Sequence, residues 1–256
     1  MNRYHRQVSV PQFGEEGQKK LSSSKIMVVG AGGLGSPVIQ YLAAAGVGEL
    51  SIVDGDVVKE SNLQRQVIHA GNIGLNKAIS AQKFVENLNP GVRVTTHPFF
   101  VDPNNVLELV ENCDVVISCP DNFRVRYLLN DACRILNRPI VHAAIYGFEG
   151  EAMTINTVNG SPCYRCLFPR APQETDSGGV MGFTAGLFGC IQAAEALKLI
   201  AGLSVLTGKY MRGDLLSMEF FTTEIKQNPN CPVCTQKLSG IYPQNYEGTC
   251  EVTKFI

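Results

Sequence analysis

A glycine-rich loop directly after a short apolar segment constrains the fold of this chain more than any other feature. Residues 25–29 read Lys-Ile-Met-Val-Val, and residues 30–35 follow as Gly-Ala-Gly-Gly-Leu-Gly. An apolar, β-branched run of this length indicates a buried parallel strand, and residues 36–45 are expected to form the next helix. In that context the GxGxxG spacing is typical of a loop whose backbone approaches a phosphate at the amino end of a helix.

An acidic residue about twenty positions further along strengthens the nucleotide interpretation. Residues 50–53 form a second predicted strand, and Asp-Gly-Asp follows at 54–56. An acid after the second strand of such a unit can bind ribose hydroxyls. The motif alone does not separate NAD from ATP. The nucleotide-binding candidates in these two loops are Gly30, Gly32, Gly33, Gly35, Asp54 and Asp56.

The rest of the chain alternates predicted strands and helices. Strands are expected over 92–97, 114–118 and 139–144, and helices over 76–88 and 122–136. This alternation predicts an α/β fold with a doubly wound, Rossmann-like, mostly parallel sheet. In the second half we expect antiparallel strands within 147–160, strands near 210–216 and 218–223, and a long buried apolar helix over 183–199.

Charge and hydropathy exclude some classes of partner. The formal net charge is -1, from 22 basic and 23 acidic residues, so neither nucleic acid nor an anionic membrane is expected as a partner. The longest apolar run near the start, Ile26 to Val29, is too short for a signal peptide or a membrane span. We therefore expect a cytoplasmic location.

Four of the nine cysteines form two CxxC pairs, Cys163 with Cys166 and Cys231 with Cys234. Two such pairs, about 64 residues apart, suit a tetrahedral, structural Cys₄ zinc site. The alternative, a redox-active CxxC, requires a strand-to-helix turn that these loops do not suggest. The other five cysteines are Cys113, Cys119, Cys133 and Cys190, expected in the core, and Cys250, in a tail.

Three further motifs complete the pattern: Ser-Asn-Leu-Gln-Arg-Gln at 61–66, Asn-Lys-Ala at 76–78 and Pro-Asp-Asn-Phe at 120–123. With the glycine loop, Asp-Gly-Asp and the paired CxxC, they make the chain resemble the ThiF/MoeB/HesA adenylyltransferases, relatives of the adenylation half of ubiquitin-activating enzymes. The resemblance covers roughly residues 3–235. Each motif is weak alone, but their order and spacing together are specific.

The resemblance implies ATP-dependent adenylation of the C-terminal glycine carboxylate of a ubiquitin-like sulfur-carrier protein of the ThiS/MoaD type, with release of pyrophosphate. It also implies a homodimer in which Arg6 acts across the interface on the partner's nucleotide. By the same resemblance, Asp54 holds the ribose. The residues that it places around the triphosphate are Asn62, Arg65, Gln66, Lys77, Asp121 and Asn122.

The chemistry explains these residue types. A carboxylate that attacks the α-phosphate of ATP brings two anions together, so the site needs positioned cations and a metal more than it needs a base. Arg65 and Lys77 are the candidate catalytic cations. Asp121, just past a predicted strand, is the candidate Mg²⁺ ligand, since Mg²⁺ takes one or two carboxylates plus substrate phosphates.

The resemblance divides the chain into four segments. We expect an N-terminal helical arm over 1–24, with a helix near 15–21, and a Rossmann-like ATP-binding region over 25–160. Residues 161–240 then hold a crossover loop, the buried helix, strands and the zinc-binding region of the same globular domain. Residues 241–256 are expected to form a C-terminal tail.

One departure from the family concerns a cysteine. Many relatives carry one in the loop between Pro169 and Val180, where this chain has Thr175 or Asp176, and no cysteine occurs from Leu167 to Gly189. We therefore expect adenylation without a covalent carrier–enzyme adduct. Cys190 and Cys250 are the candidates for a displaced thiol.

Three alternatives remain from sequence. An NAD-dependent oxidoreductase on the same fold would use His142 or Tyr146 as a proton donor, but leaves residues 61–66 and 120–123 unexplained. A non-catalytic binding module would not need the full set of acids and cations. A related enzyme would adenylate a peptide, a small carboxylate or a tRNA amide.

Overall fold

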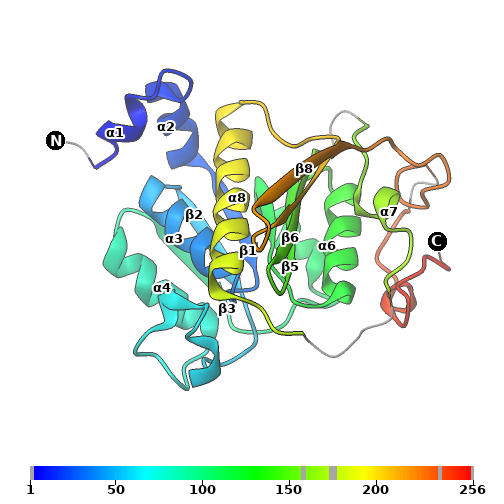
Figure 1. Cartoon of the computed structure of the whole chain (residues 1–256), viewed down its shortest axis with the longest axis horizontal. Coiled ribbons are helices and arrows are strands. Elements are labelled where there is room, and N and C mark those ends of the chain that lie inside the picture. Colours follow the sequence, from blue (N-terminus) through cyan, green and yellow to red (C-terminus); the bar gives the residue numbers. More distant parts are fainter. Residues whose placement is uncertain (1–2, 157–159, 173–177, 236–237, 255–256) are drawn as a thin grey trace.

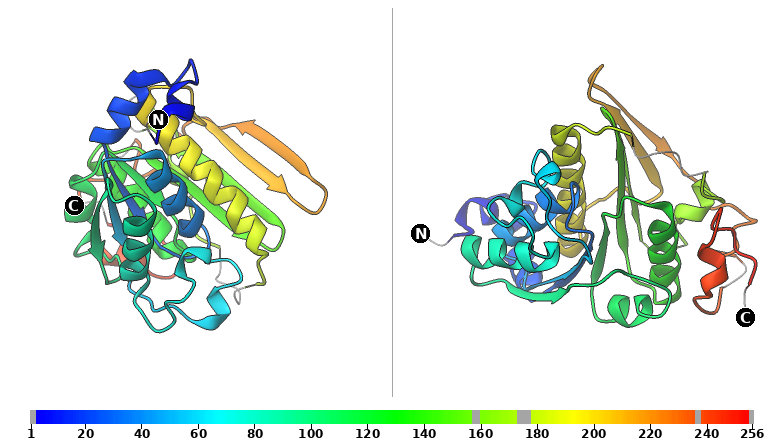
Figure 2. Two further views of the ribbon diagram at one scale, coloured as in Figure 1. Left: turned by 90° about the vertical axis from the view of Figure 1, so that its left-hand side faces the viewer. Right: turned by 90° about the horizontal axis from the view of Figure 1, so that it is seen from below.

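The computed structural model describes residues 3–156, 160–172, 178–235 and 238–254. An eight-stranded sheet in the order β3-β2-β1-β4-β5-β6-β7-β8 runs through the molecule, with helices on both faces (Figures 1 and 2). The strands β3, β2, β1, β4 and β5 pair in parallel, whereas β6, β7 and β8 pair antiparallel. The predicted parallel sheet with an antiparallel continuation is confirmed.

The strands lie close to their predicted positions. The bounds are β1 Lys25–Val29, β2 Glu49–Val53, β3 Arg93–His97, β4 Val115–Ser118, β5 Ile140–Tyr146, β6 Glu149–Ile155, β7 Lys209–Asp214 and β8 Glu219–Glu224. The central strands β1 and β4 are covered on both faces, which explains why their sequences are continuous apolar runs. All six residues of the edge strand β8 are exposed.

Five longer helices match the predicted ones: α2 Gly14–Ser23, α3 Gly35–Ala45, α4 Lys77–Leu88, α6 Phe123–Ile135 and α8 Gly182–Ala201. Shorter elements were not anticipated, because one or two turns leave no helical period to recognise. These are α1 His5–Val8, α5 Val106–Glu111, α7 Tyr164–Leu167 and the 3₁₀ turns η1 Glu60–Asn62, η2 Val67–His69 and η4 Pro243–Tyr246.

Two apolar clusters fill the space on either side of the sheet. One joins the sheet to α3, α4 and α8, and the other joins it to α5, α6 and the C-terminal segment. In Figure 2 (right), α3 and α8 lie on one side of the sheet and α6 on the other. Because β3, β2, β1, β4 and β5 pair in parallel, their carboxyl ends lie together at one edge of the sheet, next to the start of α3.

The helix α8 has the length and composition to cross a membrane, but here it packs against α3, β5 and β6. The prediction that this helix is buried holds for only one of its faces. Phe188 and Gln192 are fully buried, whereas Phe183 and Leu187 are exposed beside α3. The exposed face continues the surface around the glycine loop.

The C-terminal segment is packed against α6 and α7 rather than extended from the domain. Arg165 and Asp131 are fully buried and form an ion pair with an Nη2–Oδ2 distance of 2.8 Å. Asp131 also accepts from the Tyr246 hydroxyl at 3.1 Å, and Arg165 donates to the carbonyl of Cys250. Cys250, which the sequence analysis placed in a tail and kept as a candidate thiol, has a buried side chain.

Candidate functional site

The glycine loop joins β1 to α3 at the carboxyl edge of the sheet. Gly30 has a φ of +94°, and a Cβ there would lie 2.6 Å from the Cys119 carbonyl oxygen. A Cβ on Gly35 would lie 2.0 Å from the Gly30 carbonyl oxygen. Both positions therefore require glycine, Gly30 for its left-handed conformation and Gly35 for close packing. The strand–loop–helix context predicted for GxGxxG is confirmed.

Two side chains from residues 61–66 cover this loop. A Cβ on Gly33 would lie 3.4 Å from Arg65 Cδ, and one on Gly32 would lie 3.5 Å from Gln66 Nε2. Gln66 is buried, whereas Arg65 is half-buried, and its Nη1 donates to the Ser61 carbonyl at 3.3 Å. The loop thus carries a guanidinium group and an amide beside the free backbone N–H groups at the start of α3.

Asp54 connects β2 to the same loop. Its Oδ2 accepts from the Ala31 backbone N–H at 2.8 Å, and its Oδ1 accepts from the Asp56 N–H at 2.9 Å. Burial raises the pKa of Asp54, and these two backbone donors and the charge of Lys77 oppose that shift. The carboxylate is held rigidly at the place where the sequence pattern expects a ribose-binding acid.

Lys77 begins α4 and forms an ion pair across the site. Its Nζ lies 2.9 Å from Asp56 Oδ2, and its side chain is only 8% exposed. The hydrogen bond from Lys77 lowers the pKa of Asp56. The buried ammonium group of Lys77 can bind a second anion, such as a phosphate, either in place of the Asp56 carboxylate or together with it.

Two residues that organise the site were not among the predicted site residues. Asn76 caps α4 through its Oδ1, and its Nδ2 donates to the carbonyls of Asp54 at 2.9 Å and Asp56 at 3.1 Å. His69 is fully buried, with Nε2 at 2.7 Å from the Ala31 carbonyl oxygen. Burial lowers the pKa of His69. An Asn directly before a helix signals a cap, but nothing in the sequence signals these long-range bonds.

Asp121 and Asn122 follow β4, the strand beside β1. Asp121 is exposed, and Asn122 Nδ2 lies 3.4 Å from its Oδ1. Asn122 Oδ1 accepts from the Val125 N–H at 2.9 Å and caps α6. The oxygen of Asn122 is therefore engaged in the cap, whereas the Asp121 carboxylate remains at the surface of the carboxyl edge.

Asn62 contributes mainly to the turn that carries Arg65. Its Oδ1 accepts from the Lys59 N–H at 3.0 Å, and its carbonyl accepts from the N–H groups of Arg65 and Gln66. Strands β1, β2 and β4 end at the carboxyl edge of the sheet, and the segments that follow them carry the predicted nucleotide-binding residues. These residues are Gly30, Gly32, Gly33, Gly35, Asp54, Asp56, Asn62, Arg65, Gln66, Lys77, Asp121 and Asn122.

Arg6 does not belong to this group within one chain. It is an exposed residue of α1, which packs at the other end of α3: Gln7 Nε2 donates to the Ala45 carbonyl at 2.7 Å. The eleven residues of α3 separate that point from the glycine loop by about 15 Å. Arg6 therefore lies away from the glycine loop of its own chain.

The four cysteines of the two CxxC pairs come together beside α7. Their sulfur atoms all lie within 4.8 Å of one another, with 3.9 Å for Cys163–Cys166, 3.6 Å for Cys163–Cys231 and 3.7 Å for Cys166–Cys234. Tetrahedral zinc with Zn–S bonds of about 2.3 Å requires sulfur–sulfur distances of about 3.8 Å. These are also far longer than a disulfide bond of about 2.05 Å, so the donor set fits zinc.

A hollow of about 560 Å³ opens beside the glycine loop, between α3 and α8. Arg65, Met181, Phe183 and Cys190 are among its lining residues. Cys190 was expected in the core, which is wrong: it is half-buried at this hollow because it faces away from the sheet. Thr175 and Asp176 lie outside the described residues.

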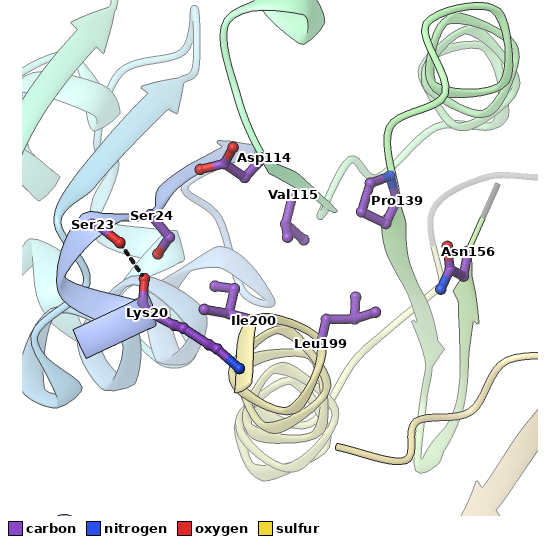
Figure 3. Close-up of a pocket in the computed structure, with 9 residues that line it drawn as sticks. All are labelled: Lys20, Ser23, Ser24, Asp114, Val115, Pro139, Asn156, Leu199 and Ile200. Atoms are coloured by element: carbon purple, nitrogen blue, oxygen red, sulfur yellow. Dashed lines mark hydrogen bonds between the residues drawn. The ribbon is translucent and has the colours of Figure 1, made fainter. Parts of the chain in front are cut away.

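A second hollow, of about 480 Å³, lies at the opposite edge of the sheet and is drawn in Figure 3. Lys20, Ser24, Asp114 and Leu199 are among its lining residues, from the amino ends of the strands and the last turn of α8. None of the predicted site residues lines it. In doubly wound sheets ligands bind at the carboxyl edge, so this hollow is not the candidate active site.

The structure gives no support to a hydride-transfer site on β5. His142 is 3% exposed, whereas Tyr146 is 66% exposed. Four residues along a strand place them about 13 Å apart. His142 Nε2 instead lies 3.8 Å from Glu151 on β6, and its ring packs on Tyr164.

Comparisons with known proteins find relatives over nearly the whole chain. The sequence model of the ThiF family matches residues 4–233. The SAMP-activating enzyme E1 of Haloferax volcanii is 48% identical, over 99% of this chain and 96% of that protein. The sulfur carrier protein adenylyltransferase of Thermus thermophilus is 42% identical, over 98% of this chain and 96% of that protein.

The adenylyltransferase and sulfurtransferase MOCS3 of Mus musculus is 44% identical over 97% of this chain, which spans 55% of that protein. Among solved structures, E. coli MccB with ATP superposes with a TM-score of 0.81 at 21% identity, over 91% of this chain and 73% of that one. At that identity the likeness shows the fold alone. The family match and the two nearly full-length relatives show that this chain belongs to the ThiF family and is an adenylyltransferase.

Proposed function

We propose that this enzyme uses ATP to adenylate the C-terminal glycine carboxylate of a small ubiquitin-like sulfur-carrier protein and releases pyrophosphate. The observation that supports the proposal is that Asp54 and Arg65 contact the glycine loop, with the Lys77–Asp56 ion pair close by, while the backbone that leads from β4 to Asp121 packs against Gly30. Of the relatives of nearly the same length, one is named a SAMP-activating enzyme and another a sulfur carrier protein adenylyltransferase. The expected test is carrier-dependent exchange of pyrophosphate into ATP.

In the proposed reaction, an oxygen of the carrier carboxylate attacks the α-phosphorus of ATP. A bond forms between this carboxylate oxygen and the α-phosphorus, the bond from the α-phosphorus to the oxygen that bridges it to the β-phosphorus breaks, and pyrophosphate leaves with that oxygen and the electron pair. No proton has to move, because the nucleophile is already an anion. The demand on the protein is therefore to neutralise and position negative charge.

The residues divide this task. The glycine loop and the start of α3 offer N–H donors to phosphate, Asp54 accepts from the ribose, and Gln66 stands over the loop. Lys77 and Arg65 supply the cations. Of these, Lys77 is the better placed for strong stabilisation, because its burial reduces screening by water. Asn62 and Asn122 hold the two loops in shape.

Asp121 would hold Mg²⁺ together with the phosphates. A metal held there would supply positive charge to the phosphates. The exposed carboxylate of Asp121 suits a metal that arrives with ATP rather than one that is permanently enclosed. The Cys₄ cluster would hold zinc as a structural ion, since all four tetrahedral positions are taken by sulfur.

A protein substrate, rather than a small carboxylate, is favoured by an apolar surface on the β7–β8 hairpin. Leu216, Met218 and Phe221 are strongly exposed there, and Phe220 is exposed beside them. The hairpin extends the sheet away from the helices in Figure 2. Exposed apolar clusters of this kind usually bind another protein, which a peptide, small-carboxylate or tRNA-amide substrate would not require.

The position of Arg6 and a second apolar surface support the proposed homodimer. Tyr41, Val67, Phe183 and Leu187 are exposed around the hollow that Arg65 lines. A second copy seated on this face would cover these side chains. It would also bring Arg6 of the partner subunit within range of the nucleotide, as an arginine finger.

We assign the enzyme to the cytoplasm.

The enzyme is expected to make carrier adenylate without a covalent carrier–enzyme adduct. Burial raises the pKa of Cys190, Cys250 is buried, and the four clustered cysteines would be metal-bound. Mass spectrometry of enzyme, carrier and ATP–Mg²⁺ without reductant should show only the two unmodified proteins and the adenylate. A reductant-sensitive adduct that disappears in Cys190→Ser would show that the thiol relay has moved to α8.

A further inference from the structure

Gln192 of α8 is a fully buried polar side chain whose hydrogen bonds all end where β4 finishes. Its Nε2 donates to the Ser118 carbonyl at 2.8 Å and to the Val141 carbonyl at 3.2 Å. Its Oε1 accepts from the Cys119 thiol at 3.4 Å. One amide from the helix layer therefore links the carboxyl end of β4 to the beginning of the neighbouring parallel strand β5, where the two strands pair.

The segment that Gln192 holds leads directly to Asp121. On the other side of this segment, the Cys119 N–H donates to the Val29 carbonyl at 2.9 Å. The Cys119 carbonyl lies so close to Gly30 that a Cβ there would be 2.6 Å away. Beyond it, the Pro120 carbonyl accepts from Arg126 Nη2 at 3.3 Å. The backbone of residues 118–120 is thus held by hydrogen bonds from α8, β1 and α6.

We propose that Gln192 is a positioning residue of the adenylation reaction: it fixes the path of residues 118–120 and thereby the direction of the Asp121 carboxylate. The proposal rests on the proposed function, because it takes Asp121 as the Mg²⁺ ligand. Gln192 touches neither substrate nor metal. Its effect is large because Mg²⁺ demands near-ideal octahedral geometry, so a small displacement of Asp121 weakens the metal–phosphate arrangement.

The test is Gln192→Met, which keeps the length of the side chain and removes the amide. We expect the kcat of pyrophosphate exchange to fall about 10–100-fold, the loss that a displacement of about 1 Å produces. The free Mg²⁺ concentration for half-maximal exchange should rise several-fold, while the KM for the carrier stays unchanged. A purely structural role would not change the Mg²⁺ dependence.

Thr154→Val is the matched control. Thr154 is buried, and its hydroxyl donates to Glu195 of the same helix, so the variant loses a buried hydrogen bond without touching β4. It should lower the melting temperature and leave the Mg²⁺ dependence unchanged. Cys119→Ala removes only the weakest of the Gln192 bonds, and should show the Mg²⁺ shift at smaller size even if Gln192→Met fails to fold.

If the wild type is active and either Gln192→Met or Cys119→Ala keeps the wild-type Mg²⁺ dependence, the inference is overturned and the proposed function still stands. A wild type that exchanges no pyrophosphate with any carrier would overturn both. The same Mg²⁺ shift in Thr154→Val would also overturn it, since the effect would then follow from lost stability.

Discussion

Replacing Asp121 by alanine is expected to lower carrier-dependent pyrophosphate exchange by about 10²–10³-fold, the scale on which a single electrostatic group in a site acts. The carboxylate is exposed, and its described neighbour, the Asn122 amide, is 3.4 Å away. Its removal should therefore change the melting temperature little, because no buried bond is lost. The measurement is exchange at saturating ATP over a range of Mg²⁺ concentrations.

Asp114 provides the matched control for this variant. It is an exposed acid that directly precedes β4, whereas Asp121 follows that strand at its other end. Asp114→Ala removes the same charge and should keep nearly full exchange. If Asp121→Ala exchanged at a rate close to that of wild type, the assignment of Asp121 to the metal would be wrong.

The same variant also tests the shared site. Arg6→Ala is expected to be inactive because the partner subunit loses its arginine finger. When Asp121→Ala and Arg6→Ala are mixed and allowed to exchange subunits, mixed dimers contain one intact site. Activity should return to about a quarter of the wild-type value, by statistical pairing in a two-fold dimer. Mixtures that stay inactive, although the subunits exchange, would exclude action of Arg6 across the interface.

Replacing Cys231 by serine is expected to unfold the protein. Structural zinc in a Cys₄ site contributes roughly 10–16 kcal/mol, which is as large as the whole stability of a typical domain, about 5–15 kcal/mol. The cluster joins α7 to the segment around Cys234, and both pack on α6 with the buried Arg165–Asp131 pair. Loss of the metal should therefore release the entire C-terminal segment.

Metal analysis and thermal unfolding check this prediction. Protein purified without added zinc should contain one zinc per chain, and a strong chelator should lower its melting temperature sharply. Cys113→Ala, at a buried cysteine outside the cluster, should retain the zinc and fold. A preparation free of zinc that remains folded and active would contradict the structural role.

Sequence patterns predicted the parallel half of the sheet because its signals are local. The run of residues 25–29, the glycine loop and the Asn before Lys77 each specify their structure within a few neighbours. The same locality explains the correct position of the longer helices. Short elements such as α1 and α7 escaped prediction, since their conformation depends on what they pack against.

Contacts between distant segments were the part that sequence could not supply. His69 is hydrogen-bonded to the Ala31 carbonyl, and Gln192 donates to the carbonyl of the last residue of β4. The bonded residues are far apart in the sequence, so no periodic pattern reveals these contacts. In the same way, Arg165 holds the Cys250 carbonyl and turns an apparent tail into part of the core. The prediction that Cys190 lies in the core was wrong, because a helix that is apolar all round gives no signal of which face packs against the sheet.

The most direct test of the central claim is ATP–pyrophosphate exchange with purified wild-type enzyme, Mg²⁺ and a panel of small ubiquitin-like carriers. Carriers that end in Gly-Gly should support exchange of labelled pyrophosphate into ATP, and the same carriers without the last glycine should not. NAD should neither support a reaction nor compete. Two results would contradict the proposed function. One is pyrophosphate exchange that does not depend on a carrier carboxylate, and the other is no exchange with any carrier that ends in Gly-Gly.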